Sequence, residues 1–325
     1  MEGTKHPVPG VDYPRTFQEF DEWFGSEAKC REYVRRLRWP DGFVCQECGV
    51  VGEAWVVSRE RFRCRSCKEE TSLTAGTIFA DTRKPLRMWF LAIWFVTSQK
   101  NGVSALGLQR VLGLGSYETA WTWLHKLRRA MVRPGRDALS GVVEVDETYV
   151  GGPEEGVRGR QTETKAIVVV AAEESGRGVG RIRLRRVVDV SGDSLISFVR
   201  DAVAPGSVVH TDGWSGYAGL AKAGYAHRVT VISRSAEMAH EVMPRVHIVA
   251  ALLKRWLDGT HQGGVQHQHL DYYFDEFIFR FNRRHARARG LLFYRLVQQA
   301  VAVGPAPYPV IIGRSQRATP SAQVV

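Results

Sequence analysis

The sequence lacks any long hydrophobic run. Its longest apolar stretch, residues 88–96, is far shorter than the roughly 20 residues that cross a membrane. Residues 1–13 contain no apolar core flanked by basic residues, so we expect no secretory signal, no membrane partner and a cytoplasmic protein. Internal repeats are also missing, and the five cysteines are too few for a disulfide-dense secreted scaffold.

Acidic residues are the minority among the charged ones. There are 45 Lys and Arg against 34 Asp and Glu, which gives a formal net charge of +11. A basic excess of this size favours a polyanionic partner, in particular nucleic acid. With 325 residues, of which 44% are hydrophobic, the chain has enough apolar material for the cores of about two domains.

Four of the cysteines form two C-x-x-C pairs, Cys45 with Cys48 and Cys64 with Cys67. The spacing matches a four-cysteine zinc site, in which two tight turns each supply two thiolates to one tetrahedral ion. Four protein ligands leave no open position, so the zinc is predicted to be structural. The alternative, a pair of redox-active motifs, lacks the surrounding βαβ pattern. Cys30 lies in a helical pattern and is interpreted as a small buried hydrophobe.

The segment between the cysteine pairs is predicted to form a β-hairpin. Because side chains alternate along a strand, Arg59, Arg61, Arg63 and Arg65 would share one face. Such a face could contact DNA phosphates, and the alternative is an ordinary solvated strand.

Helical patterns flank this module. Residues 17–38 are predicted to form one helix, which Pro40 ends. Segments 85–99, 103–112 and 117–131 are predicted to form three more, the last two as a helix-turn-helix with Ser116 as N-cap. Lys126 and Arg129 of the final helix are candidate DNA contacts.

After residue 134 the pattern changes to an alternation of strands and helices. Strands are predicted at 142–150, 166–172, 182–190, 208–211 and 227–232, and helices at 193–203, 214–223, 237–257 and 268–284. This order fits an α/β mixed sheet with flanking helices.

Two aspartates lie on or beside these strands. Asp146 is in the middle of its strand on the side opposite Val143 and Val145, and a buried carboxylate needs a partner. A divalent metal is the simplest one. Asp212 directly follows a strand, where α/β sheets present functional groups. Taken singly, either could be a turn or capping residue, and the combination favours a metal site.

Four strings carry a resemblance to a known family. They are residues 143–152 (VEVDETYVGG), 210–217 (HTDGWSGY), 252–256 (LLKRW) with 259–261 (GTH), and 275–284 (DEFIFRFNRR). Together they resemble bacterial insertion-sequence transposases, which join an N-terminal zinc ribbon to an RNase H-like integrase domain with a DDE-type triad. The resemblance covers roughly residues 17–300. It implies that the strands of Asp146 and Asp212 are neighbours and that a third catalytic residue lies on the following helix.

The third position departs from that pattern, because His247 stands where the family usually has an acid. His247 ranks first as third ligand, ahead of Glu276 and Glu241, and a structural histidine is the alternative. A neutral imidazole can bind a metal, though it suits softer ions than Mg²⁺. Lys254, seven residues on, would share the helix face and contact DNA phosphate.

The implied function is DNA transposition: metal-dependent strand cleavage and strand transfer of an insertion sequence. Asp146 and Asp212 would hold Mg²⁺ or Mn²⁺, and the partners would be double-stranded DNA and further copies of the chain assembled on it, at the bacterial nucleoid. The alternatives are a catalytically inactive zinc-ribbon DNA-binding protein and a host nuclease. The predicted layout is an N-terminal helix (1–40), the zinc ribbon (41–80), the helical DNA-binding module (81–135), the RNase H-like catalytic domain (136–300) and a flexible tail (301–325).

Overall fold

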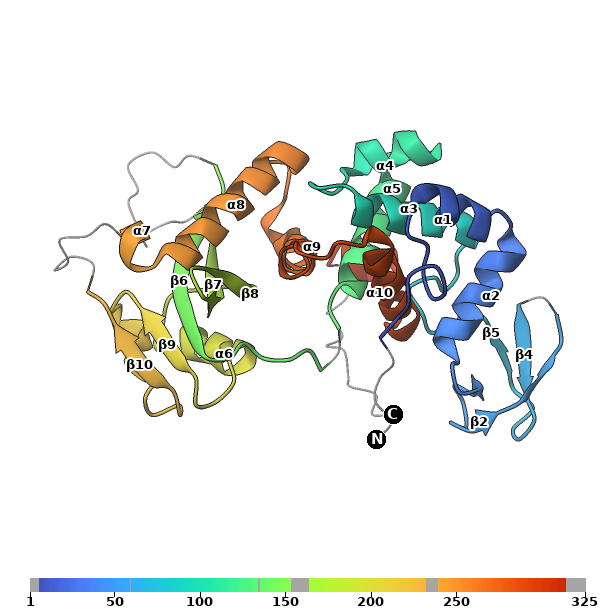
Figure 1. Cartoon of the computed structure of the whole chain (residues 1–325), viewed down its shortest axis with the longest axis horizontal. Helices are drawn as coiled ribbons and strands as arrows, with labels where there is room; N and C mark the ends of the chain where they lie inside the picture. Colours follow the sequence, from blue (N-terminus) through green and yellow to red (C-terminus); the bar gives the residue numbers. More distant parts are fainter. Residues whose placement is uncertain (1–5, 59, 134, 153–163, 232–238, 314–325) are drawn as a thin grey trace. The chain divides into compact units, whose positions relative to one another are not determined.

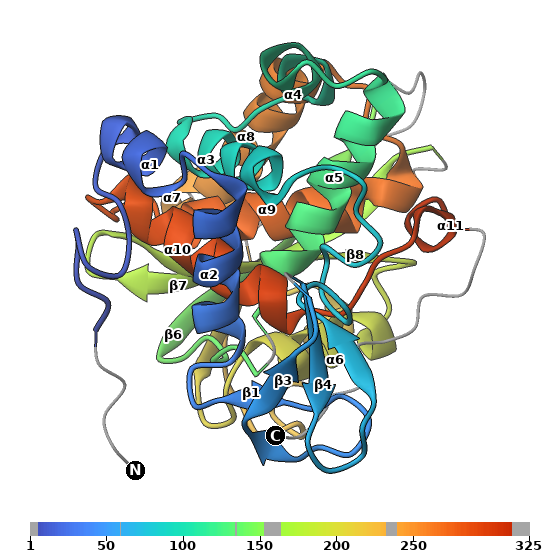
Figure 2. The same cartoon turned by 90° about the vertical axis from the view of Figure 1, so that its right-hand side faces the viewer.

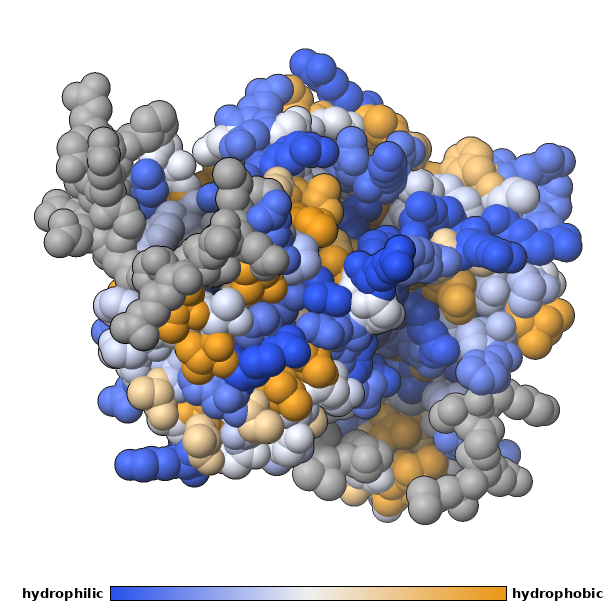
Figure 3. All heavy atoms as spheres, turned by 60° about the vertical axis from the view of Figure 1, so that its left-hand side comes forward, coloured by the Kyte–Doolittle hydropathy of each residue, from blue (hydrophilic) through white to orange (hydrophobic). Residues whose placement is uncertain are grey.

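The computed structural model describes the chain except for residues 1–5, 59, 134, 153–163, 232–238 and 314–325. The chain divides into two compact units (Figure 1). The first joins Met1–Pro134 to His285–Val325, and the second, Gly135–Arg284, is inserted between these two parts. Among the described residues, no helix has the length and apolarity that a membrane crossing requires. On the face in Figure 3, hydrophobic residues form separate patches interrupted by hydrophilic ones.

The first unit is built around an aromatic core. Its helices are α1 (Phe17–Trp23), α2 (Glu27–Arg38), α3 (Leu86–Ser98), α4 (Ala105–Leu112), α5 (Tyr117–Ala130), α10 (Arg289–Ala302) and α11 (Tyr308–Ile311). Phe293 of α10 is fully buried, and its ring lies 5.4 Å from Phe20, 5.5 Å from Phe24 and 5.5 Å from Phe90. Aromatic pairs at these separations add to the free energy gained by burial. The helix that follows the inserted unit therefore completes the core begun by the N-terminal helices.

Local sequence explains where these helices begin and end. The single helix predicted over 17–38 is wrong, because the chain breaks after α1 and the Ser26 hydroxyl caps α2 by accepting from Lys29 N at 3.4 Å. The three helices predicted over 85–131 are confirmed, as is Ser116, whose Oγ accepts from Thr119 N at 3.1 Å. Of the predicted tail, the described part contains α11, in which Ile311 is buried.

The zinc ribbon consists of short antiparallel strands (Figure 2). They are β1 (Phe43–Val44), β2 (Val51–Gly52), β3 (Ala54–Val56), β4 (Arg61–Cys64) and β5 (Glu70–Ser72). The predicted hairpin between the cysteine pairs is confirmed as β3–β4. In β4, Phe62 and Cys64 are buried while Arg61 and Arg63 are exposed, which is the alternation expected of a half-buried strand.

The second unit is a mixed sheet, which confirms the predicted α/β class. Its strands are β6 (Val142–Val150), β7 (Ala166–Ser175), β8 (Gly178–Val187), β9 (Val208–Thr211) and β10 (Ala226–Val229), in the spatial order β10-β9-β6-β7-β8. β7 runs antiparallel to β6 and β8, whereas β6, β9 and β10 are parallel. This is the RNase H-like arrangement that the resemblance implies, with β6 and β9 as neighbours.

Helices cover both faces of this sheet. α6 (Gly192–Ala202) packs with Val143 and Val145 of β6 in one buried cluster. α8 (Pro244–His261) and α9 (Leu270–Asn282) pack with Val168 and Val170 of β7 in another (Figure 1). Within this second cluster α8 lies on β6 and β7, and α9 lies on the edge strand β8.

Two predicted helices of this unit differ from the structure, and the unit ends earlier than predicted. The helix predicted over 214–223 is only a short 3-10 turn, Ser215–Tyr217. Of the helix predicted over 237–257, residues 237 and 238 lie outside the described residues. The rest is divided between α7 (Ala239–Val242) and α8, because Pro244 starts a new helix. Residues 285–300, expected in the catalytic domain, cluster instead with the first unit.

Candidate active site and zinc centre

Alternation along β6 directs two acids to the same face of the sheet. Val143 and Val145 point into the α6 cluster, so Glu144 and Asp146 point to the face covered by α8. The Asp146 side chain keeps 16% of its surface exposed, and its Oδ1 accepts a hydrogen bond from Glu147 N at 2.8 Å. One carboxylate oxygen is thus engaged locally, while Oδ2 faces the covering helix.

Asp212 is carried to the same place by the neighbouring parallel strand. The β6–β9 register ends where Glu144 pairs with His210, and Asp146 and Asp212 each follow two residues later on their own segments. Both lie close enough to Tyr217 to raise its pKa. Asp212 follows the last residue of β9, where its Oδ1 accepts from Trp214 N at 2.9 Å. The next residue, Gly213, has φ +88°, and a Cβ there would lie 3.0 Å from Val229 Cγ1. Only glycine suits this turn, which holds Asp212 at the strand end.

A buried tyrosine lies beside the carboxylates. Tyr217 is fully buried, and burial raises its pKa well above the usual value. The carboxylates of Glu147, Asp146 and Asp212 raise the Tyr217 pKa further, in that order. The phenol is therefore neutral and adds no charge to an already acidic neighbourhood. Sequence reasoning missed Tyr217, although it belongs to the string 210–217.

His247 of α8 meets Asp146 across this face. Its Nε2 lies 3.9 Å from Asp146 Oδ2, and the imidazole side chain is 33% exposed. Two donors bound at about 2.1 Å to one ion lie roughly 3–4 Å apart, so this oxygen–nitrogen pair fits a shared divalent ion. Asp146 and His247 are therefore a candidate pair of metal ligands, whereas among the described residues Asp212 does not bring a third ligand atom within 4.8 Å of both.

The other candidates for the third position lie elsewhere. Glu276 is on α9, which covers β8 rather than β6, and its buried Oε1 accepts from Arg280 Nε at 2.9 Å. Glu241 is an exposed residue of α7. Lys254 is exposed on α8, two helical turns beyond His247.

A second acidic cluster adjoins the site, and arginines occupy it. Ligand atoms of Glu144, Glu174 and His210 lie within 4.8 Å of one another. Arg245 donates to Glu144 Oε1 at 2.7 Å and to Glu174 Oε1 at 3.3 Å, and Arg228 donates to Glu174 at 3.1 Å. Burial first, and then the Arg228 guanidinium, lower the pKa of His210 to about 4. Guanidinium groups already balance these carboxylates, so the cluster is an ion-pair network rather than a metal centre.

The zinc ligands form a compact tetrad in the ribbon. The four sulfur atoms lie within 4.8 Å of one another, with 3.5 Å between Cys45 and Cys67 and 3.6 Å between Cys48 and Cys64. A tetrahedral ion at about 2.3 Å from each sulfur needs sulfur–sulfur distances of about 3.8 Å, so the residues fit zinc. The backbone N–H of Cys67 is the main cause that lowers the pKa of Cys64 to about 6, while burial and then the neighbouring thiols raise the pKa of Cys67 to about 12. The four thiols are thus close enough to share protons without metal.

Each cysteine pair is closed by the same backbone turn. Gly49 N donates to Cys45 O at 3.0 Å, and Lys68 N donates to Cys64 O at 3.2 Å. Both residues have positive φ, +69° and +67°. Glycine suits the first turn as expected, and Lys68 adopts a left-handed conformation that non-glycine residues rarely take. The two turns present their thiolates in equivalent ways to one ion.

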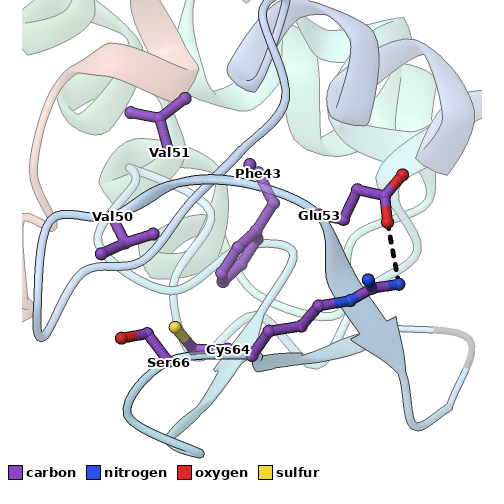
Figure 4. A pocket seen from close by; sticks show the side chains of 8 residues that line it. Phe43, Val50, Val51, Glu53, Cys64 and Ser66 are labelled. Atoms are coloured by element: carbon purple, nitrogen blue, oxygen red, sulfur yellow. Dashed lines mark ion pairs between the residues drawn. The ribbon is translucent and has the colours of Figure 1, made fainter.

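A shallow pocket of about 460 Å³ lies beside the tetrad (Figure 4). Its lining includes Phe43, Val50, Val51 and Cys64, and its rim carries the ion pair of Arg65 with Glu53 at 2.8 Å. It contains none of the candidate catalytic residues, so it is a surface feature of the ribbon.

The predicted DNA contacts differ in how many acidic neighbours they have. Arg61 and Arg63 form exposed ion pairs with Glu70, at 3.2 Å and 2.6 Å, and Arg65 pairs with Glu53, while Arg59 lies outside the described residues. Lys126 and Arg129 are only partly exposed on α5, and burial lowers the pKa of Lys126. Neighbouring carboxylates therefore offset part of the basic surface of the ribbon.

Comparisons with known proteins agree with a zinc ribbon followed by a transposase domain. Residues 25–70 match the transposase zinc-ribbon domain, and residues 138–282 match the ISXO2-like transposase domain, both of the IS1595 type. A protein of Halobacterium salinarum, described as an uncharacterized protein in transposable element ISH50, is 27% identical over 263 residues, which are 74% of this chain and 86% of that protein.

Solved structures give only weak likenesses. A simian T-cell lymphotropic virus intasome with a PP2A regulatory subunit has a TM-score of 0.32 at 15% identity, covering 57% of this chain and 70% of that chain. The Mos1 mariner paired end complex has a TM-score of 0.28 at 12% identity, covering 66% and 75%. Scores this low say nothing about the chemistry of this chain.

The zinc ribbon and the DDE-type domain on an RNase H-like sheet define a DNA transposase. Two segments of the chain are thus similar to the two domains of IS1595-type transposases, and the Halobacterium salinarum protein, which is similar to most of the chain, belongs to a transposable element of an archaeal host.

Proposed function

We propose that the enzyme cleaves DNA strands at the ends of its element and transfers them to a target, with Asp146, Asp212 and His247 as the ligands of divalent metal. The observation that carries this proposal is the approach of His247 Nε2 to within 3.9 Å of Asp146 Oδ2, beside the turn that holds Asp212. Ions bound there would activate water or a DNA 3′-hydroxyl and stabilise the leaving oxygen in an in-line displacement.

The ligands have separate tasks. Asp146 lies on β6 with His247 across from it on α8, and Asp212 follows the end of β9, so Asp146 would hold metal together with His247 and Asp212 would supply a further carboxylate. A histidine that binds metal is neutral, so a site of two aspartates and His247 carries one negative charge less than a site of three acids. Because imidazole suits softer ions, we expect Mn²⁺ to support the reaction better than Mg²⁺.

Basic side chains hold the DNA. Lys254 is exposed on the helix that carries His247, so it is placed to contact a phosphate near the reacting bond. We propose that the ribbon arginines Arg61, Arg63 and Arg65 and the α5 residues Lys126 and Arg129 contact duplex DNA, with zinc in a structural role. Copies of the chain would assemble on the element ends, in the nucleoid of the host cell.

A catalytically inactive DNA-binding descendant is the second candidate. The observation that favours it is His247, a histidine where the family usually carries an acid. The deciding experiment incubates the full chain with labelled duplexes of the element ends, a target plasmid and Mg²⁺ or Mn²⁺. Cleavage with joining to the plasmid supports the transposase, binding without cleavage supports the descendant, and cleavage without joining indicates a nuclease.

A further inference from the structure

A buried ion pair joins the strand of Asp146 to the helix of His247. Glu144 Oε1 accepts from the Arg245 guanidinium at 2.7 Å, and the two side chains are 1% and 14% exposed. The same carboxylate accepts two backbone hydrogen bonds through Oε2, from Arg245 N at 2.8 Å and Val246 N at 3.0 Å. Glu144 thus supplies the cap that α8 lacks, since no side-chain hydrogen bond comes from its own N-cap, Met243.

The guanidinium of Arg245 extends this connection to the neighbouring hairpin. It donates to Gly176 O at 2.9 Å and to Gly178 O at 3.1 Å, in the turn between β7 and β8, and to Glu174. Burial of a carboxylate destabilises the fold unless the charge is paired and hydrogen-bonded. The carboxylate of Glu144 has both the Arg245 guanidinium and two backbone N–H groups as partners. The first turn of α8 is therefore tied to three strands at once.

The spacing of these residues links the ion pair to the metal site. Asp146 follows Glu144 by two residues on the same face of β6, and His247 follows Arg245 by two residues on α8. The ion pair and the Asp146–His247 contact both join β6 to the start of α8. Glu144 therefore fixes the distance of the first turn of α8 from the sheet and the rotation of the helix about its axis. Both determine where His247 lies.

We infer that Glu144 and Arg245 are positioning residues, which hold the first turn of α8 so that His247 meets Asp146 at metal-binding distance. This inference rests on the proposed function. Neither residue touches the reacting atoms, and the resemblance assigns no role to either, although Glu144 belongs to the string 143–152. Groups that orient metal ligands typically change metal affinity by about 10–100-fold when removed. Glu144→Gln and Arg245→Met are therefore expected to raise the half-saturating Mn²⁺ concentration by about this factor.

The experiment measures Mn²⁺ binding to the full, zinc-loaded chain and DNA cleavage as a function of Mn²⁺. Glu144→Gln removes the charge of the cap, while Arg245→Met leaves the backbone hydrogen bonds to Glu144 in place. Ser191→Ala is the matched control, because it deletes the N-cap of α6 in the same unit without touching α8. Glu174→Gln removes the other carboxylate of Arg245. DNA binding without divalent metal and hydrogen exchange at the first turn of α8 are recorded for each variant.

The inference predicts that Glu144→Gln and Arg245→Met raise the half-saturating Mn²⁺ concentration. In Glu144→Gln the amide hydrogens of residues 245–246 should also exchange faster. Both variants should recover part of their cleavage activity at saturating Mn²⁺, and their DNA binding should be unchanged. Ser191→Ala should keep the parent value, and Glu174→Gln, which removes only the longer contact of Arg245, should raise it less than Glu144→Gln. If Glu144→Gln does not fold, Arg245→Met decides alone. A parent-like Mn²⁺ half-saturation in the folded variants, or an equal rise in Ser191→Ala, overturns the inference. If Asp146→Ala alters neither Mn²⁺ binding nor cleavage, the proposed function fails instead.

Discussion

The zinc centre and the acidic site are assembled in opposite ways. Each half of the zinc centre is a turn of a few residues, closed by its own backbone hydrogen bond, at Gly49 and at Lys68. The acidic site takes Asp146 from β6, Asp212 from the end of β9 and His247 from α8, so its geometry depends on the whole sheet and a covering helix. The spacing of its residues in the sequence predicts a local site. A site whose residues come from distant segments depends in addition on residues such as Glu144, which hold those segments together.

Loss of a zinc ligand should have the largest effect and should stay local. Cys64→Ser removes one of four thiolates, and structural zinc contributes about 10–16 kcal/mol of binding free energy that is also folding free energy. We expect the purified variant to lose its one zinc ion and the ribbon to exchange its amide hydrogens freely, while β6 and β9 stay protected. Elemental analysis and hydrogen-exchange mass spectrometry measure both. Cys30→Ala, at a buried cysteine outside the tetrad, should keep zinc; a zinc-loaded Cys64→Ser would contradict the assignment.

Removal of an active-site carboxylate should have the next largest effect, on rate rather than on folding. Asp146→Ala and Asp212→Ala should each slow cleavage and strand transfer by about 10³-fold or more, because a bound metal supplies several kcal/mol of transition-state stabilisation. The double variant should be little worse, since the ligands act as a unit. DNA binding should be retained in gel-shift assays. Asp201→Ala, at an exposed residue of α6 paired with Arg185, should behave like the parent; equal loss there would remove the special role of the two aspartates.

Replacement of His247 tests whether the acidic site needs its proposed third ligand. His247→Ala should reduce cleavage by about 100-fold, the upper range for altered metal affinity, and the parent should prefer Mn²⁺ to Mg²⁺. Glu276→Gln serves as comparison, because Glu276 is paired with Arg280 on a helix that covers another strand. Cleavage rates in both metals decide the matter. An active His247→Ala together with an inactive Glu276→Gln would show that the acid on α9 is the third member.

The smallest effects should come from the exposed charges of the ribbon. DNA affinity should fall steeply with added salt, because bound lysines and arginines release counterions. Arg61 and Arg63 share Glu70, and exposed ion pairs are worth about 0–1 kcal/mol, so Glu70→Gln should strengthen DNA binding only about two- to fivefold. Arg63→Ala should weaken binding to a similar extent. Fluorescence anisotropy at several salt concentrations measures both; a flat salt response would argue against a phosphate-driven interface.

Much of this layout was open to prediction because it depends on local chemistry. Cysteine spacing indicated the ribbon, and alternation indicated the bounds of β6 and β9 and the face of Asp146. The prediction that Ser116 caps the N-terminus of a helix was also correct. The break before α2 was not predicted, because apolar residues recur at helical spacing across Ser26 throughout residues 17–38.

Features that could not be predicted depend on contacts between distant segments. Arg245 and Glu144 are 101 residues apart, and only the folded sheet shows that one caps the helix of the other. An available signal was overlooked, however: Glu144 is two residues before Asp146, so alternation puts a second acid on the same buried face. Tyr217 gave no such signal, because its role depends on which carboxylates surround its ring.

The insertion of the second unit within the first has a consequence for protein synthesis. The aromatic core of the first unit needs Phe293, which the ribosome makes only after the complete RNase H-like unit. Until then Phe20, Phe24 and Phe90 have no partner from α10, and the growing chain exposes them. Since domains generally fold as units during synthesis, the sheet of the second unit can form first, and the N-terminal part of the first unit must wait for α10. A chain that terminates after residue 284 would keep Asp146, Asp212 and His247 and lose the Phe293 ring that completes the aromatic core of the first unit.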